Sequence, residues 1–62
     1  MPMTPKEMER LLLKNGFVFD WQKGSHRVFR NETTQKTVIV PMHAKDLKKG
    51  TEQQILKDAG LK

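Results

Sequence analysis

The sequence predicts a small α+β domain in which one helix precedes three antiparallel strands and a second helix follows them. Three observations lead to this prediction. Segments with helical spacing of apolar residues lie at both ends, segments with alternating or β-branched residues lie between them, and short turns join the latter. Short connections favour antiparallel neighbours. We therefore expect a three-stranded antiparallel sheet with two helices on one face, in a single domain spanning residues 1–62.

The first helix is predicted to begin after Thr4. Pro5 suits the first helical position, and Glu7 stands three residues after Thr4, which is the spacing of a capping box. Asn15-Gly16 ends the helix, because glycine adopts the left-handed conformation of a C-terminal cap without steric cost. Apolar residues at helical spacing predict one buried face, which comprises Met8, Leu11 and Leu12.

Three strands are expected in the middle of the chain. Phe17, Phe19 and Trp21 occupy every second position, the pattern of a half-buried strand. The remaining order is a turn over 23–25, a strand over 26–31, a turn over 32–35 and a strand over 37–40. Val28 and Phe29 are adjacent, so they cannot both face the core of a flat sheet. We favour Phe29 as the buried residue because its larger ring gains more from burial, which places His26, Val28 and Arg30 on the open face.

The second helix is predicted to follow a polar, basic connection over 42–50. Thr51 and Gln54 have the spacing of a capping box, and the helix would continue through Ile55, Leu56 and Ala59. Gly60 would then take the position after the cap, with Leu61 touching Leu56 as in a Schellman motif. The resulting α-β-β-β-α layer resembles a reduced double-stranded-RNA-binding fold.

Size and composition exclude most enzyme classes. A chain of 62 residues buries only about 60% of the surface of its unfolded form, which leaves no deep pocket and no dinucleotide site. The sequence contains no cysteine, so disulfides, thiol nucleophiles and the usual zinc-finger ligands are excluded. His26 and His43 lack helical metal-ligand spacing, and we expect no metal and no cofactor. The longest apolar run, Leu11–Leu13, cannot span a membrane and no signal-peptide pattern precedes it, so we expect a cytoplasmic protein without membrane association.

The net charge of +5 is concentrated in the middle of the chain. Seven basic and two acidic residues lie between positions 23 and 49, which accounts for the whole excess, and the flanks balance. Such a local excess is typical of a phosphate-binding face, and we favour RNA as the partner over a merely solvated surface of mixed charge. The candidate RNA-binding residues are Lys23, Gly24, Ser25, Arg27, Arg30, Lys36, His43, Lys45, Lys48 and Lys49.

His26 is the candidate catalytic residue. It follows the Gly24-Ser25 turn at the start of a strand, where its imidazole can stand at the surface. Imidazole both accepts and donates a proton near neutral pH. Because RNA carries its own nucleophile, the ribose 2′-hydroxyl, one imidazole and nearby cations would suffice to cleave it to a 2′,3′-cyclic phosphate, and DNA would not react. The alternative is a structural histidine that bridges a turn amide and a neighbouring strand.

Several nearby residues have two interpretations. His43 has three possible roles: a contact to phosphate, a second proton carrier, or a cap on a backbone carbonyl. We favour the last of these. Phe19 and Trp21 either stack on bases or belong to the core, and their strand spacing favours the core. The lysines before the second helix are either phosphate contacts or solvated loop charges; they are Lys45, Lys48 and Lys49.

Five short motifs follow one another along nearly the whole chain. They are Asn15-Gly16-Phe17, Lys23-Gly24-Ser25-His26 with Phe29, Val38-Ile39-Val40-Pro41 with His43, Lys48-Lys49-Gly50-Thr51, and Ile55-Leu56 with Ala59-Gly60-Leu61. This ordered set resembles the HicA family of toxins from bacterial toxin–antitoxin pairs. In a chain of this length, the set is specific for that family.

The resemblance implies a small double-stranded-RNA-binding-like fold and a ribonuclease activity on mRNA that slows translation. The histidine of the Gly-Ser-His motif is the family's catalytic residue, which corresponds to His26. The resemblance also implies a cognate HicB-like antitoxin whose partly RNase H-like domain covers the toxin and blocks its active site. We therefore expect a type II toxin that is a metal-independent mRNA endoribonuclease. The alternatives are a non-catalytic RNA-binding module of the same fold and a domain that binds only an acidic protein partner.

Overall fold

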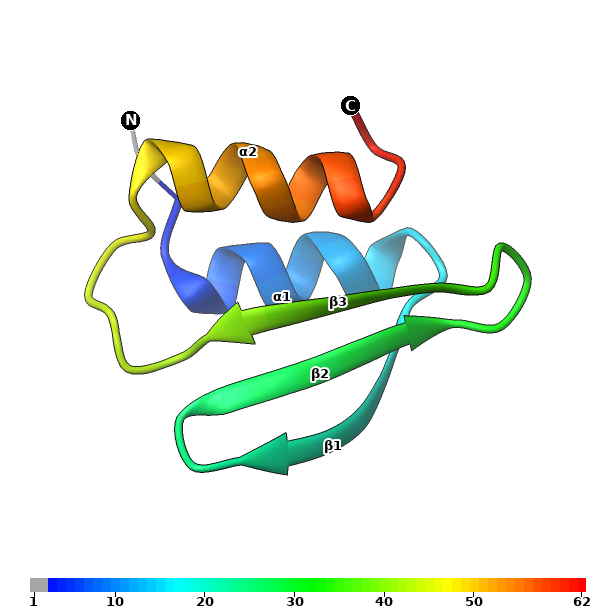
Figure 1. The fold of residues 1–62 in the computed structure, drawn as a ribbon, viewed down its shortest axis with the longest axis horizontal. Coiled ribbons are helices and arrows are strands. Elements are labelled where there is room, and N and C mark those ends of the chain that lie inside the picture. The colour runs from blue at the N-terminus through cyan, green and yellow to red at the C-terminus, as the bar shows by residue number, and fades with distance from the viewer. Residues whose placement is uncertain (1–2) are drawn as a thin grey trace.

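Both helices cover one face of a three-stranded antiparallel sheet, as predicted (Figure 1). The computed structural model describes residues 3–62. The elements in chain order are α1 (Pro5–Lys14), β1 (Val18–Lys23), β2 (His26–Asn31), β3 (Lys36–Pro41) and α2 (Lys49–Asp58). The strand order is β1-β2-β3, so β2 is central and the other two strands form the edges. Tight turns join consecutive strands, which accounts for the antiparallel pairing.

The predicted signals at both ends of α1 are confirmed. The Thr4 hydroxyl accepts a hydrogen bond from the Glu7 N–H at 3.1 Å, and the Thr4 N–H donates to Glu7 Oε1 at 2.9 Å. The backbone N–H of Thr4, followed by its hydroxyl, lowers the pKa of the Glu7 carboxyl below its ordinary value. At the other end Gly16 has a φ of +89°, and the Phe17 N–H donates to the Leu12 carbonyl at 3.0 Å. This is the Schellman geometry, and it delivers Phe17 into the core.

The predicted start of α2 is wrong. The cap residue is Lys48, with no side-chain cap, and Thr51 lies within the first turn rather than before it. Contacts distant in sequence set the earlier start: the Leu47 N–H donates to the Met3 carbonyl at 2.8 Å, and the Met3 N–H donates to Glu52 Oε1 at 2.9 Å. The N-terminal segment therefore holds the entrance of α2 where a local capping box was expected.

The predicted end of α2 is confirmed. Gly60 follows the Ala59 cap with a φ of +75°. The Leu61 N–H donates to the Leu56 carbonyl at 2.9 Å, and the Gly60 N–H donates to the Lys57 carbonyl at 3.0 Å. These two bonds complete a Schellman motif. Neither helix in residues 3–62 is long and apolar enough to cross a membrane.

The predicted alternation in β1 is also wrong, because the strand contains a bulge. Phe17 is buried but precedes the strand, and Phe19 pairs with Phe29 on the helix-covered side. The register then shifts between Phe19 and Trp21, so that Trp21 pairs with Val28. An extra residue in one strand turns the following side chain to the other face. Phe19 and Trp21 therefore lie on opposite faces, and they are 49% and 51% exposed rather than buried in the core.

The choice between the two neighbours in β2 is confirmed. Phe29 is fully buried in the core cluster beneath the helices. Val28 lies on the open face, where it is nevertheless only 4% exposed because its cross-strand neighbours Trp21 and Ile39 flank it. His26 occupies the same face, two residues before Val28.

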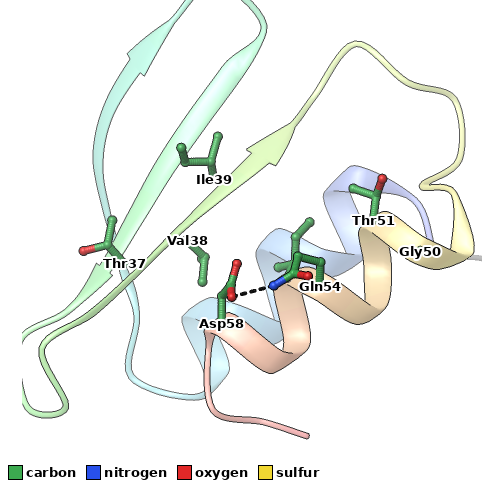
Figure 2. A pocket seen from close by; sticks show the side chains of 8 residues that line it. Thr37, Val38, Ile39, Gly50, Thr51, Gln54 and Asp58 are labelled. Carbon is green, nitrogen blue, oxygen red and sulfur yellow. Dashed lines mark hydrogen bonds between the residues drawn. The ribbon is translucent and has the colours of Figure 1, made fainter.

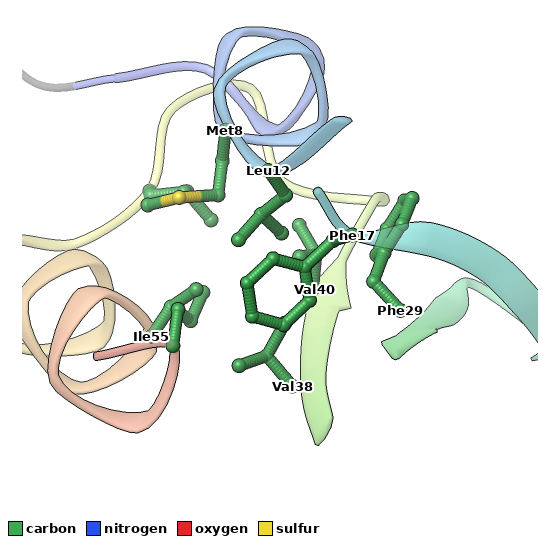
Figure 3. Packing of buried hydrophobic residues seen from close by; sticks show 9 residues of the cluster. Met8, Leu12, Phe17, Phe29, Val38, Val40 and Ile55 are labelled. Atoms are coloured by element: carbon green, nitrogen blue, oxygen red, sulfur yellow. The ribbon is translucent and has the colours of Figure 1, made fainter. Parts of the chain in front are cut away.

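One hydrophobic cluster joins the two helices to the covered face of the sheet (Figure 3). Phe17 and Phe29 are its largest fully buried side chains. The remaining members are Met8, Leu12, Val38, Val40, Leu47, Ile55 and Ala59. Because this cluster takes up one face of the sheet, the other face is left available to contact solvent or a partner.

Candidate active site

The fold brings the two histidines of the chain together at one end of the sheet. His26 is the first residue of β2 and pairs with Lys23 of β1 and Pro41 of β3. Because β3 ends at Pro41, the following loop carries His43 past the start of β2. The centroids of the two imidazole rings lie 5.8 Å apart, with their planes inclined at 56°. Both side chains are exposed, so the pair is accessible from solvent.

The interpretation of His43 as a cap on a backbone carbonyl is wrong. Its Nδ1 lies 3.1 Å from the Ser25 hydroxyl oxygen, and the direction of that hydrogen bond depends on the imidazole tautomer. The two segments are also joined through the backbone, since the Met42 N–H donates to the Ser25 carbonyl at 2.6 Å. With Nδ1 directed at Ser25, Nε2 is the nitrogen of His43 that is available to a ligand.

Gly24 sets the turn that leads into His26. Its φ of +58° lies in the left-handed region, which favours glycine. A Cβ at this position would meet no neighbouring atom within 4 Å, so backbone conformation rather than space requires the glycine. The Gln22 side-chain amide donates to the Gly24 carbonyl at 2.8 Å and ties the turn to β1.

Two of the predicted RNA-binding lysines lie beside the imidazole pair. Lys23 lines the same surface hollow as His26, and Lys48 lines a second hollow together with His43. Lys45, two residues after His43, borders a third hollow together with Lys6 of α1. Lys49 is exposed in the first turn of α2.

The other candidate cations are not gathered around His26. Arg27 lies on the helix-covered side, where its guanidinium contacts Glu9 at 2.7 Å and Gln22 at 3.1 Å and stands 5.5 Å from the Phe19 ring centroid. Arg30 is on the open face at the far end of β2, 4.0 Å from Asp20. Lys36 begins β3 at the opposite end of the sheet, and its aliphatic chain lies against Gly60. The cluster along the sequence is therefore divided between two faces and two ends.

A hollow of about 470 Å³ borders His26 on the open face of the sheet. Its lining residues are Trp21, Lys23, Gly24, Ser25, His26, Val28 and Ile39. The sequence pattern assigned Trp21 to the core, and the pattern contains no signal for the bulge that turns this residue to the open face. The sequence analysis weighed base stacking for Trp21 but favoured the core, and that preference is wrong.

A separate hollow, of about 390 Å³, lies between β3 and α2, away from both histidines (Figure 2). Within it the Gln54 side-chain amide donates a hydrogen bond to Asp58 Oδ1 at 2.8 Å. Figure 2 marks this bond between the two α2 side chains with a dashed line. Its lining contains neither histidine nor a basic residue. Among residues 3–62, no group of three or more metal-ligating side chains is arranged to hold a metal ion.

A family model described as the HicA toxin of bacterial toxin–antitoxin systems matches residues 5–61. The chain belongs to the HicA toxin family. The matched range contains both helices, all three strands and both histidines. Membership in the HicA family makes this chain the toxin of a toxin–antitoxin pair and implies a HicB-type antitoxin as its partner. The search of curated proteins found no match.

Proposed function

We propose that this HicA-family toxin is a metal-independent endoribonuclease that cleaves mRNA with the imidazoles of His26 and His43 as its proton carriers. The observation that carries the proposal is the exposed imidazole pair, with ring centroids 5.8 Å apart and lysines beside it. Cleavage of RNA through its own 2′-hydroxyl needs one group that accepts a proton and one that donates a proton. Two imidazoles on either side of a phosphate meet both needs.

The proposed reaction is a transfer of the phosphoryl group within the RNA. One imidazole, in its neutral form, takes the proton from the 2′-hydroxyl as that oxygen attacks phosphorus. The other, in its protonated form, gives a proton to the 5′-oxygen as the bond between phosphorus and that oxygen breaks. The products are a 2′,3′-cyclic phosphate and a free 5′-hydroxyl. The protons balance, because one imidazole gains a proton from the 2′-hydroxyl and the other loses a proton to the 5′-oxygen.

The neighbouring residues have supporting roles in this proposal. The Ser25 hydroxyl holds His43 through Nδ1 and so directs Nε2 toward the phosphate. Lys23 lines the same hollow as His26 and Lys48 the same hollow as His43, and their positive charge would stabilise the negative charge that grows on the phosphate oxygens. Arg30, Lys45 and Lys49 lie farther along the surface and would bind flanking phosphates. Because Arg27 is engaged with Glu9, we place it outside the phosphate-binding set.

The first test is cleavage of a single-stranded RNA oligonucleotide in the presence of EDTA. We expect cleavage by the parent protein and a loss of about 10²- to 10⁴-fold in rate for His26→Ala and for His43→Ala. Lys57→Ala is the matched control, because it removes an exposed charge from α2, away from the pair. Circular dichroism should report the same fold in all variants. Cleavage by His26→Ala at the parent rate would contradict the proposal, and RNA binding without cleavage by the parent protein would favour the non-catalytic module.

An RNA with a 5′-sulfur in place of the scissile 5′-oxygen assigns the two roles. A thiolate leaves without being protonated, so this substrate restores the rate of the variant that lacks the general acid. It does not restore the variant that lacks the general base. Restoration of one histidine variant and not the other is the expected result. If neither variant is restored, or if both are restored equally, the division of roles within the pair is contradicted.

We further propose that the HicB-type antitoxin inhibits by covering this pair. Both imidazoles lie on an exposed surface, so a protein bound over them would exclude RNA without changing the fold of the toxin. The test is competition between antitoxin and a non-cleavable 2′-deoxy oligonucleotide for the purified toxin. Simultaneous binding of both would contradict this mode of inhibition.

A further inference from the structure

The open face of the sheet presents an apolar row that the helices do not cover. Trp21, Val28 and Ile39 are cross-strand neighbours, one from each strand. Trp21 and Ile39 are 51% and 55% exposed, whereas Val28 between them is almost fully buried. The outer two residues therefore form walls, and Val28 forms the floor of the hollow that also includes His26. With neighbouring strands about 4.8 Å apart, the backbones that carry the walls are separated by about 10 Å.

We propose that this hollow is a nucleobase-binding subsite in which the Trp21 indole stacks on an unpaired base next to the phosphate that is cleaved. The inference rests on the proposed ribonuclease function and adds to it a residue that binds a base of the RNA. Base stacking on an aromatic side chain requires an exposed ring beside a path for the phosphate backbone. Trp21 is such a ring, and Lys23 and His26 border the same hollow.

The chemistry of the lining favours a nucleotide over an apolar protein segment. A nucleotide joins a flat apolar ring to an anionic phosphate, and the hollow joins an indole and two aliphatic side chains to the Lys23 ammonium and the His26 imidazole. None of its lining residues is acidic. His26 and Val28 are two residues apart on one face of β2, a separation of about 7 Å. One nucleotide can therefore place its base over Val28 while its phosphate lies at the imidazole.

The same lining predicts what kind of RNA is cut. A base in a duplex is stacked and paired on both sides, so it must leave the helix before it can enter the hollow. Single-stranded RNA offers such a base at much lower cost. The walls are mainly apolar and offer few groups that would read the edge of a base. We therefore infer a requirement for an unpaired base, with stacking rather than base-edge hydrogen bonding as its main source of affinity.

The chain offers a direct optical test, because Trp21 is its only tryptophan. The probe is a single-stranded 2′-deoxy oligonucleotide, which lacks the nucleophile and cannot be cleaved. We expect it to quench the tryptophan fluorescence of the parent toxin. An abasic oligonucleotide with the same number of phosphates should bind but leave the fluorescence nearly unchanged. Equal quenching by both oligonucleotides would overturn the proposal, because charge alone would then account for the signal.

The second test compares two aromatic residues of β1. Trp21→Ala should weaken binding of the intact oligonucleotide between about 5-fold and about 150-fold, as expected from the loss of one base stack, and Trp21→Phe should recover part of it. Phe19→Ala is the matched control, because Phe19 is equally exposed but lies on the other face of the sheet. In cleavage assays Trp21→Ala should raise KM more than it lowers kcat. Unchanged affinity in Trp21→Ala would overturn the subsite.

The tests separate this inference from the proposed function. If the intact oligonucleotide quenches the tryptophan fluorescence of the parent toxin but the toxin does not cleave RNA, the subsite stands and the ribonuclease proposal fails. If it cleaves RNA while Trp21→Ala binds and cleaves normally, the ribonuclease stands and the subsite fails. Loss of antitoxin binding in Trp21→Ala with unchanged RNA affinity would overturn the subsite and identify the open face as a protein-docking surface.

Discussion

The two faces of the sheet use similar side chains for different purposes. The covered face holds Phe29 and the Arg27–Glu9 ion pair, and both connect the sheet to α1 or to the core. The open face holds Trp21 and Arg30, which are exposed. Phe19 and Trp21 are only two residues apart in sequence, yet the bulge in β1 assigns them to different faces. In a domain this small, the core takes up one face of the sheet, so the open face is the one left for the contacts that we propose with RNA.

The largest expected difference between the two faces is in how much a side-chain truncation lowers the free energy of unfolding. Phe29→Ala should cost about 3–5 kcal/mol, because it removes a fully buried ring from the core. That loss is comparable to the whole free energy of unfolding of a 62-residue domain, roughly 3–9 kcal/mol. Ile39→Ala on the open face should change stability by less than about 0.5 kcal/mol, since its side chain is 55% exposed. Urea denaturation measures both, and a large loss for Ile39→Ala would mean that the open face also supports the fold.

A smaller effect is expected at the start of α1. Thr4→Ala should lower stability by about 1 kcal/mol, because the Glu7 N–H loses its side-chain acceptor. The pKa of Glu7 is lowered in the folded state, so its stabilising contribution is present above the unfolded-state pKa and is lost as the pH falls through the folded-state pKa. Glu7→Gln should remove that part of the acid sensitivity. Thermal unfolding as a function of pH checks both variants, while RNA binding should stay unchanged.

The smallest contrast is between the two arginines of β2. Arg27→Ala should lower stability by roughly 0.5–1 kcal/mol, since its ion pair with Glu9 is partly exposed. Arg30→Ala should leave stability unchanged but reduce the salt dependence of RNA binding by about one phosphate contact. Denaturation and binding at several salt concentrations measure the two effects. If Arg27→Ala reduced the salt dependence and Arg30→Ala did not, the assignment of the faces to folding and binding would be reversed.

Features that depend on neighbours in sequence were predictable. The capping box at Thr4 and the glycine ends of both helices involve residues within a few positions of each other, so their patterns are visible in the sequence. The burial of Phe29 followed from side-chain size alone. The place of His26 after a glycine turn predicted that its imidazole stands at the surface, and the structure shows this side chain exposed.

Features that depend on distant contacts were not predictable. The start of α2 is set by Met3, which is remote in sequence from Glu52. The contact of His43 with Ser25 exists because β3 returns the chain to the start of β2. The bulge in β1 has no sequence signal, since no glycine or proline lies within the strand. The first error concerns where α2 begins, and the other two concern which end or face of the sheet a side chain reaches.

The exposed position of the imidazole pair has a consequence for control inside a cell. Both imidazoles are exposed, so under the proposed function RNA would reach them and leave again without any opening motion of the protein. A toxin built like this would have no resting conformation of its own. Its activity would follow the molar ratio between toxin and antitoxin, so the relative lifetimes of the two proteins would set the concentration of unbound toxin.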